Sequence, residues 1–196
     1  IQASYRKNPE RRAADLAYHL VEAGNLADPE QVIHWSANAG NNAMKTAAFE
    51  EAAHYFSTAI AELGDGVVNE GADEAKEQKA DLLHTRGAAQ LSLGRKDSFL
   101  EDLKAAYDQY AELRLGEKAA RVAADISYIH VWNGEPDRVF DQVIRALQLL
   151  GDEETPGRCQ LLSAHGLAHT MGREPADAER SHQAAVILAR KLGGEQ

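Results

Sequence analysis

The histidines are the residues of this sequence with the greatest capacity for metal chemistry, and there are eight of them in 196 residues. His165 and His169 are four residues apart, so a helix carries them on one face, and His182 falls on the expected antiparallel partner helix. Three converging imidazoles would supply nitrogen ligands for Zn²⁺. The segment lacks the glutamate of an HExxH motif and offers no obvious fourth ligand. We therefore expect no metal, and keep a helical metal-dependent enzyme using His165, His169 and His182 as the alternative function.

Other residues with possible chemistry also favour structural roles. Glu51 and His54 have the ExxH spacing of di-iron bundles, but those proteins need two such motifs and two further glutamates, so this pair is expected on a solvated face. The segment Gly64–Gly71 contains Asp65, Asn69 and Glu70 without the alternating carboxylates of an EF-hand, which indicates a flexible connection. Cys159 is expected to be a small core or surface residue. Trp35 and Trp132 could anchor a partner, but core packing is the expectation for both.

The motifs of common catalytic folds are absent from the sequence. It contains neither GxxxxGK[ST] nor GxGxxG, so no nucleotide-phosphate loop is expected, and it contains no GxSxG nucleophile elbow. We accordingly expect no catalytic residue, no cofactor and no enzymatic activity. The function that remains is binding.

Composition narrows the class of partner. Lys and Arg number 21 against 31 for Asp and Glu, and the net charge of −10 opposes direct binding of nucleic acid or anionic lipid. A single cysteine fits a reducing compartment, and no run of 18 apolar residues is present, so we expect a cytoplasmic location. The hydrophobic share of 44% with only 6% aromatics predicts helices packed through Ala and Leu.

A pattern of mostly small residues repeats along the chain. Its three positions are separated by 12 and then 7 residues, and helix hairpins explain the spacing because small side chains let two antiparallel helices approach closely. One hairpin cannot bury its apolar face, so neighbouring hairpins should stack. The starts lie 47, 40 and 39 residues apart, and the four sets are Gly40, Ala52, Ala59; Gly87, Phe99, Ala106; Ser127, Val139, Ala146; and Gly166, Ala178, Ala185.

Helix start and stop signals agree with this repeat. Asn8-Pro9, Asp28-Pro29 and Thr155-Pro156 each place a capping side chain before a proline at the first helical position. Glycines stand where helices should end, at 24, 94, 134, 151 and 172. The expected fold is all-α with about nine helices, at 9–23, 29–45, 48–63, 72–93, 96–113, 116–133, 136–150, 156–171 and 174–192.

We expect these helices to form a single domain. The hairpins are 29–64, 72–113, 116–150 and 156–192, preceded by an unpaired helix at 9–24. An odd helix number and a first residue other than Met suggest a fragment of a larger protein.

Two resemblances refine the class of protein. Leu91–Gly94 followed by Phe99, Leu103 and Ala106, and the run from Phe49 to Ala59, resemble the tetratricopeptide pattern, although the repeats exceed its usual 34 residues. The resemblance implies a right-handed superhelix of antiparallel helix pairs. The segments 12–24 and 28–40 are similar to the helical region that follows the ATPase in bacterial STAND regulators, of the LuxR/MalT-like or adenylate-cyclase-linked kind. That resemblance implies a sensor and docking role beside other domains of the parent chain.

The tetratricopeptide resemblance also implies a ligand groove. In that family the first helices of the hairpins line the concave surface, which takes a protein segment or a small effector. Ala37 occupies a position where chaperone-tail binders carry lysine, which argues against that ligand. Self-association through edge hairpins is a further possibility. Carried over by the repeat register, the groove candidates are His34, Asn41, Met44, Asp81, His84, Arg121, Tyr128, Gln160 and Ser163.

Overall fold

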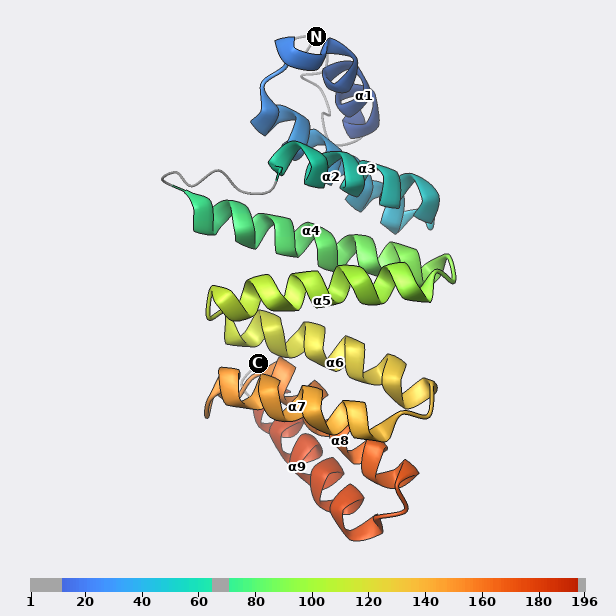
Figure 1. Cartoon of the computed structure of the whole chain (residues 1–196), viewed down its shortest axis with the longest axis vertical. Coiled ribbons are helices and arrows are strands. Elements are labelled where there is room, and N and C mark those ends of the chain that lie inside the picture. Colours follow the sequence, from blue (N-terminus) through green and yellow to red (C-terminus); the bar gives the residue numbers. More distant parts are fainter. Residues whose placement is uncertain (1–11, 65–70, 194–196) are drawn as a thin grey trace. The chain divides into compact units, whose positions relative to one another are not determined.

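The computed structural model describes residues 12–64 and 71–193, and within these ranges it contains helices and turns but no strand. The all-α repeat fold is thus confirmed (Figure 1). The helices are α1 (Ala13–Ala23), α2 (Pro29–Lys45), α3 (Phe49–Leu63), α4 (Ala72–Ser92), α5 (Lys96–Glu112), α6 (Gly116–Trp132), α7 (Pro136–Leu150), α8 (Pro156–Met171) and α9 (Pro175–Gly193), with a 3₁₀ turn at Gly24–Leu26.

Two of the predicted helix starts are confirmed at the level of hydrogen bonds. The Asp28 carboxylate accepts from the amide of Glu30 at 3.1 Å, and the Thr155 hydroxyl accepts from the amide of Arg158 at 3.2 Å. A proline is the first residue of both helices, where its missing N–H costs nothing. The predicted start at Asn8-Pro9 and most of the 64–71 segment, including Asp65, Asn69 and Glu70, lie outside the described residues.

The turn inside each hairpin repeats as regularly as the small residues do. In every one, the amide of one residue donates to the carbonyl five residues earlier at 2.9 Å, the bond that closes a Schellman motif. The residue before the donor has a positive φ: Ala47, Gly94, Gly134 or Arg173. Gly172 directly follows the last residue of α8, as predicted, but its φ is −69° and Arg173, at +60°, takes the left-handed position.

All twelve residues of the 12-and-7 pattern are buried, as expected for positions between packed helices. At Gly40 an added Cβ would lie 2.7 Å from the ring of Phe56, and at Gly166 it would lie 2.7 Å from the ring of His182. Both contacts are shorter than carbon atoms tolerate. A side chain at either glycine would therefore force the facing ring to shift, as expected where the two helices of a hairpin cross closely.

The chain divides into two compact units, up to Asp102 and from Leu103 onward, so that the boundary falls inside α5. In the first unit, α2 packs against α1 on one side and against α3 on the other, and α3 packs against α4. Its main core contains Ile33, Phe56 and Leu82 among alanines. A buried ion pair adds to it, with Arg86 Nε donating to Asp102 at 2.9 Å and Arg86 Nη1 to the Ser57 hydroxyl at 3.1 Å.

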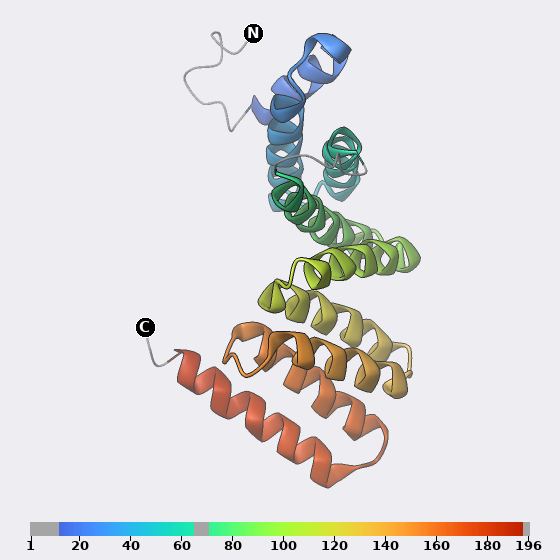
Figure 2. The same cartoon turned by 60° about the vertical axis from the view of Figure 1, so that its left-hand side comes forward.

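In the second unit, α6, α7, α8 and α9 follow one another as neighbouring antiparallel helices (Figure 2). Val139, Val143, Leu150 and Leu161 fill the core between alanines of α6 and α8. The Glu117 carboxylate accepts from the amide of Gly157 at 3.1 Å, which ties α6 to the first turn of α8. In neither described range is a helix long and apolar enough to cross a membrane.

Candidate functional site

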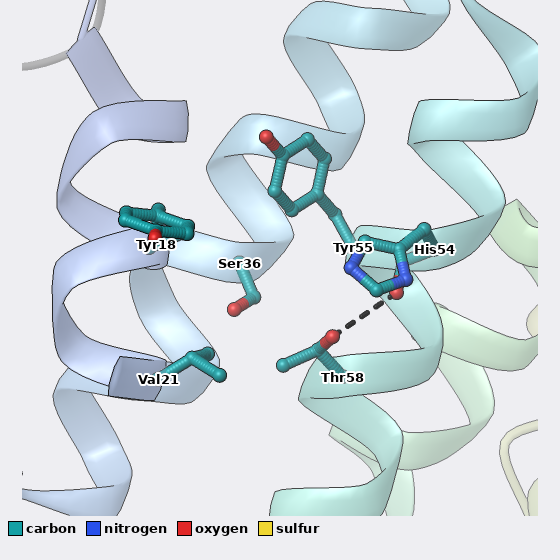
Figure 3. Close-up of a pocket in the computed structure, with 7 residues that line it drawn as sticks. Tyr18, Val21, Ser36, His54, Tyr55 and Thr58 are labelled. Carbon is teal, nitrogen blue, oxygen red and sulfur yellow. Dashed lines mark hydrogen bonds between the residues drawn. The ribbon is translucent and has the colours of Figure 1, made fainter. Parts of the chain in front are cut away.

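A narrow cleft lies between α1 and α3, above α2, in the first unit (Figure 3). It forms because both helices pack against α2 and leave space between their facing side chains. Its volume is about 110 Å³. The lining residues are Ala17, Tyr18 and Val21 from α1, Ser36 from α2, and His54, Tyr55 and Thr58 from α3.

Ser36 at the floor of this cleft is the most unusual polar residue of the first unit. The residue is 0% exposed, yet its hydroxyl has no hydrogen-bond partner among the described residues. Other helical hydroxyls bond the carbonyl four residues back, as Ser57 does to Ala53 at 2.8 Å and Ser127 to Ala123 at 2.7 Å. A buried hydroxyl without a partner is unfavourable by about 1–3 kcal/mol.

The walls of the cleft are aromatic and its surroundings are acidic. Tyr18 is 60% exposed, and Tyr55 lies half-buried opposite it. Burial raises the pKa of Tyr55 above its usual 10.0, and the carboxylates of Glu51 and Asp15 raise it further. The phenol is therefore neutral at physiological pH and can donate a hydrogen bond. Thr58 instead donates its hydroxyl proton to the carbonyl of His54, at 3.2 Å.

The cleft continues along α1 into a wider depression of about 540 Å³. Val21 and Thr58 line both spaces, so the two are contiguous. Leu20, Val32 and Ala61 make much of the wider part apolar. A narrow cleft that opens into a wider depression of mixed polar and apolar lining can hold one side chain of an extended partner and support the residues beside it.

The predicted groove residues lie on the first helices of the hairpins and do not contribute to this cleft. Those of α2 and α4 belong to the first unit, and those of α6 and α8 to the second. Within each helix they form one partly exposed stripe. His34, Asn41, Asp81, Arg121 and Gln160 are exposed, whereas Met44, His84, Tyr128 and Ser163 are half-buried. The groove they would form stays a prediction.

Of the three histidines considered for a metal site, two lie together. The rings of His165 and His169 are 4.5 Å apart between centroids, and Phe140 of α7 packs on both. His165 Nδ1 bonds the Ser181 hydroxyl at 3.0 Å. Burial lowers the pKa of His165, and His169 beside it lowers that pKa further.

His182 does not join them. It packs against Gly166, at the repeat position held by Phe56, Leu103 and Val143 in the earlier hairpins. Among the described residues, the set of three potential ligands within 4.8 Å of one another is His169, Glu174 and Asp177. The structure therefore does not bring His165, His169 and His182 together as one set of ligands.

Four smaller predictions can also be compared with the structure. Trp35 is half-buried and packs on Ala13, Ala17 and Ala39, as expected. Trp132, for which core packing is the prediction, is instead 74% exposed at the last residue of α6. Cys159 is half-buried, with its thiol 3.3 Å from the Ala185 carbonyl. Glu51 and His54 are exposed, as expected for a solvated pair.

The repeated hairpins define an all-α helical repeat protein. No family model and no curated protein matches the sequence. Among solved structures, the chain is similar to the crystal structure of BtubC (BKLC) from P. vanneervenii, with a TM-score of 0.73 and 16% sequence identity. The match covers 97% of this chain and 77% of that one, and at this identity it shows a shared fold.

Proposed function

We propose that this chain is a binding module, a helical repeat of the tetratricopeptide type that holds a protein segment or a small effector. The observation that carries the proposal is the cleft between α1 and α3, whose floor is the buried and unpartnered hydroxyl of Ser36. A partner group that hydrogen-bonds this hydroxyl would remove a cost that the free protein bears. The proposal includes no catalytic residue and no direct contact with nucleic acid or membrane.

The size of the cleft points to the kind of group that enters it. A space of about 110 Å³ accommodates one small side chain or a few heavy atoms of an effector. Tyr18 and Tyr55 offer flat apolar surface with polar ends, and such side chains are enriched at binding sites because they bury much area for little lost entropy. The contiguous trough beside Leu20 and Val32 would receive the flanking part of the partner.

The wider biological role that we propose is sensing or docking in a bacterial transcriptional or signalling regulator in the cytoplasm. It rests on the resemblance of segments 12–24 and 28–40 to STAND regulators, and α1 and α2, which these segments form, supply two of the three sides of the cleft. For the module to transmit a signal, its ligand must bind one conformation of the parent protein more tightly than another. The partly exposed stripes of the first helices offer a second surface for the same role.

A peptide-display selection against the purified chain tests the proposal. Thr58→Trp should plug the cleft, because Thr58 lines both the narrow and the wide part. We expect selected peptides to bind the wild-type chain and to lose binding to Thr58→Trp, while Tyr128→Ala on α6 leaves that binding unchanged. Selected peptides that bind Thr58→Trp as tightly as wild type would exclude the cleft. Loss of binding in Tyr128→Ala instead would assign the function to the first-helix stripes.

Self-association is a second candidate interaction, favoured by the outer face of α9. Val186 is 48% exposed and Ile187 is 68% exposed. In the preceding hairpin Leu147, at the position of Val186, packs against the core. We expect Ile187→Lys to reduce any dimer detected by light scattering, and an unchanged mass would show that this face is not an interface.

A further inference from the structure

The turns of the last two hairpins share a pair of residues. His130 Nδ1 bonds Glu135 Oε2 at 2.7 Å between α6 and α7, and His169 Nδ1 bonds Glu174 Oε2 at 2.5 Å between α8 and α9. Both pairs span five residues. In each pair the backbone amide of the glutamate also donates to the carbonyl of the histidine, which is the bond that closes the turn. The shared pair therefore has a structural role in both turns, since it links the end of one helix to the start of the next.

The residue three positions after the glutamate differs between the two turns. Arg138 lies three residues after Glu135, and its guanidinium is 3.6 Å from that carboxylate, so the first turn is a compensated His–Glu–Arg arrangement. The residue equivalent to Arg138 in the second turn is Asp177, which lies three residues after Glu174 and 39 positions after Arg138. The second turn therefore holds an imidazole and two carboxylates, where the first holds an imidazole, a carboxylate and a cation.

The geometry points to a metal site, and we propose that His169, Glu174 and Asp177 bind a first-row divalent transition metal such as Zn²⁺. One nitrogen and two carboxylate oxygens lie within 4.8 Å of one another. Ligand atoms around tetrahedral Zn²⁺ are about 3.3 Å apart, given bonds of about 2.0–2.1 Å, so small rotations of exposed side chains close the site. An imidazole with two carboxylates suits such ions better than Mg²⁺ or Ca²⁺, which favour all-oxygen ligands.

The surroundings fix one ligand and leave the other two adjustable. The side chain of His169 is 15% exposed and is held between Phe140 and the ring of His165. Glu174 and Asp177 are 53% and 39% exposed, so both can move toward an ion and leave a position for water. Arg180 donates a hydrogen bond to one oxygen of Asp177. A metal would either displace this guanidinium or share the Asp177 carboxylate with it.

The test uses the difference between the two turns. Tag-free protein stripped with a chelator is titrated with Zn²⁺ by calorimetry and with Co²⁺ by visible absorption. We expect one equivalent to bind to wild type, and Asp177→Arg, which copies the sequence of the first turn, to weaken the affinity by about tenfold or more through loss of a charged ligand. Circular dichroism checks that this exposed substitution leaves the fold intact.

The reciprocal variant provides a gain of function. Arg138→Asp copies the second turn into the first, beside His130 and Glu135, and should raise the stoichiometry from one ion to two. The proposal is overturned if wild type shows no binding tighter than millimolar, or if Asp177→Arg binds as tightly as wild type. A stoichiometry that stays at one in Arg138→Asp would also count against it.

Discussion

Gly40 and Phe56 meet where α2 crosses α3, with no space for a methyl group between them. A Cβ on Gly40 would lie 2.7 Å from Phe56 Cε1, and Phe56 is 1% exposed. A fully buried ring has nowhere to move, so the contact fixes the distance between the two helices. The same relationship recurs between Gly166 and His182 in the last hairpin, where the ring is only half-buried.

We expect Gly40→Ala to lower the free energy of unfolding by about 1–3 kcal/mol, the usual cost of overpacking a core. Gly166→Ala should cost less, because His182 can rotate toward solvent. Gly172→Ala is the matched control, since its nearest neighbour would be 3.6 Å away and its φ is −69°, and it should be close to neutral. Urea titrations measure all three, and equal losses at 40 and 172 would contradict the close crossing.

The ion pair between Arg86 and Asp102 is expected to be important for the first unit. The side chains are 22% and 8% exposed, so Asp102→Ala would leave a largely buried guanidinium without its main partner. We expect a loss of about 2–4 kcal/mol, somewhat below that for a fully buried pair. Arg86→Met combined with Asp102→Leu should recover much of it.

The exposed pair of Arg95 and Glu50 serves as the control for this prediction. Its side chains are 47% and 66% exposed, so Glu50→Ala should cost less than about 1 kcal/mol. Similar losses in Asp102→Ala and Glu50→Ala would show that burial of the first pair has no energetic consequence.

The left-handed residue in the turn between α8 and α9 offers a stabilising substitution. Arg173 has a φ of +60°, a conformation that costs a residue with a Cβ about 1–2 kcal/mol. Arg173→Gly should therefore raise the stability of the second unit by about 0.5 kcal/mol after the entropy of glycine is included. Arg173→Ala keeps the strain and should give no gain. Gly134→Ala, at a φ of +75°, should be destabilising by about 1 kcal/mol.

Tyr55 should make the first unit sensitive to alkali. Its pKa is raised in the folded chain by burial, and further by Glu51 and Asp15, above the usual 10.0. Above pH 10 the unfolded chain releases this proton more readily than the folded chain, so stability is complete below that pH and is lost as pH rises through the folded pKa. Thermal unfolding at pH 8 and above pH 10 should show a smaller alkaline loss for Tyr55→Phe than for wild type. An identical loss would mean that other groups cause it.

Much of the fold is predictable from the sequence because the constraint is local. The pattern that begins with Gly40, Ala52 and Ala59 recurs in three further sets of residues. All of these residues are buried between helices, so their spacing gives the helix register directly. The first residues of α2 and α8 follow from the N-capping residues Asp28 and Thr155. The left-handed residue at 173 is not predictable from the nearby Gly172. The bond from the Glu174 amide to the His169 carbonyl places the positive φ at the residue before the donor, which is Arg173.

The candidate sites were less accessible to sequence reasoning. His182 was grouped with His165 and His169 by helix pairing, but its register places it opposite Gly166. The cleft depends on how packing against α2 places α1 and α3, which are not neighbours in sequence. One signal was present: Ser36 lies on the same buried stripe as Val32, Ile33 and Ala39, where a hydroxyl is out of place.

The most direct test of the binding function is to measure Ser36→Ala for both stability and affinity. Removing a buried hydroxyl that has no partner should raise the free energy of unfolding by about 1 kcal/mol. The same variant should bind a display-selected peptide several-fold more weakly, because the hydrogen bond at the floor of the cleft is lost. Ser127→Ala, equally buried but bonded to Ala123, should leave affinity unchanged. A Ser36→Ala chain that binds as tightly as wild type would contradict the account.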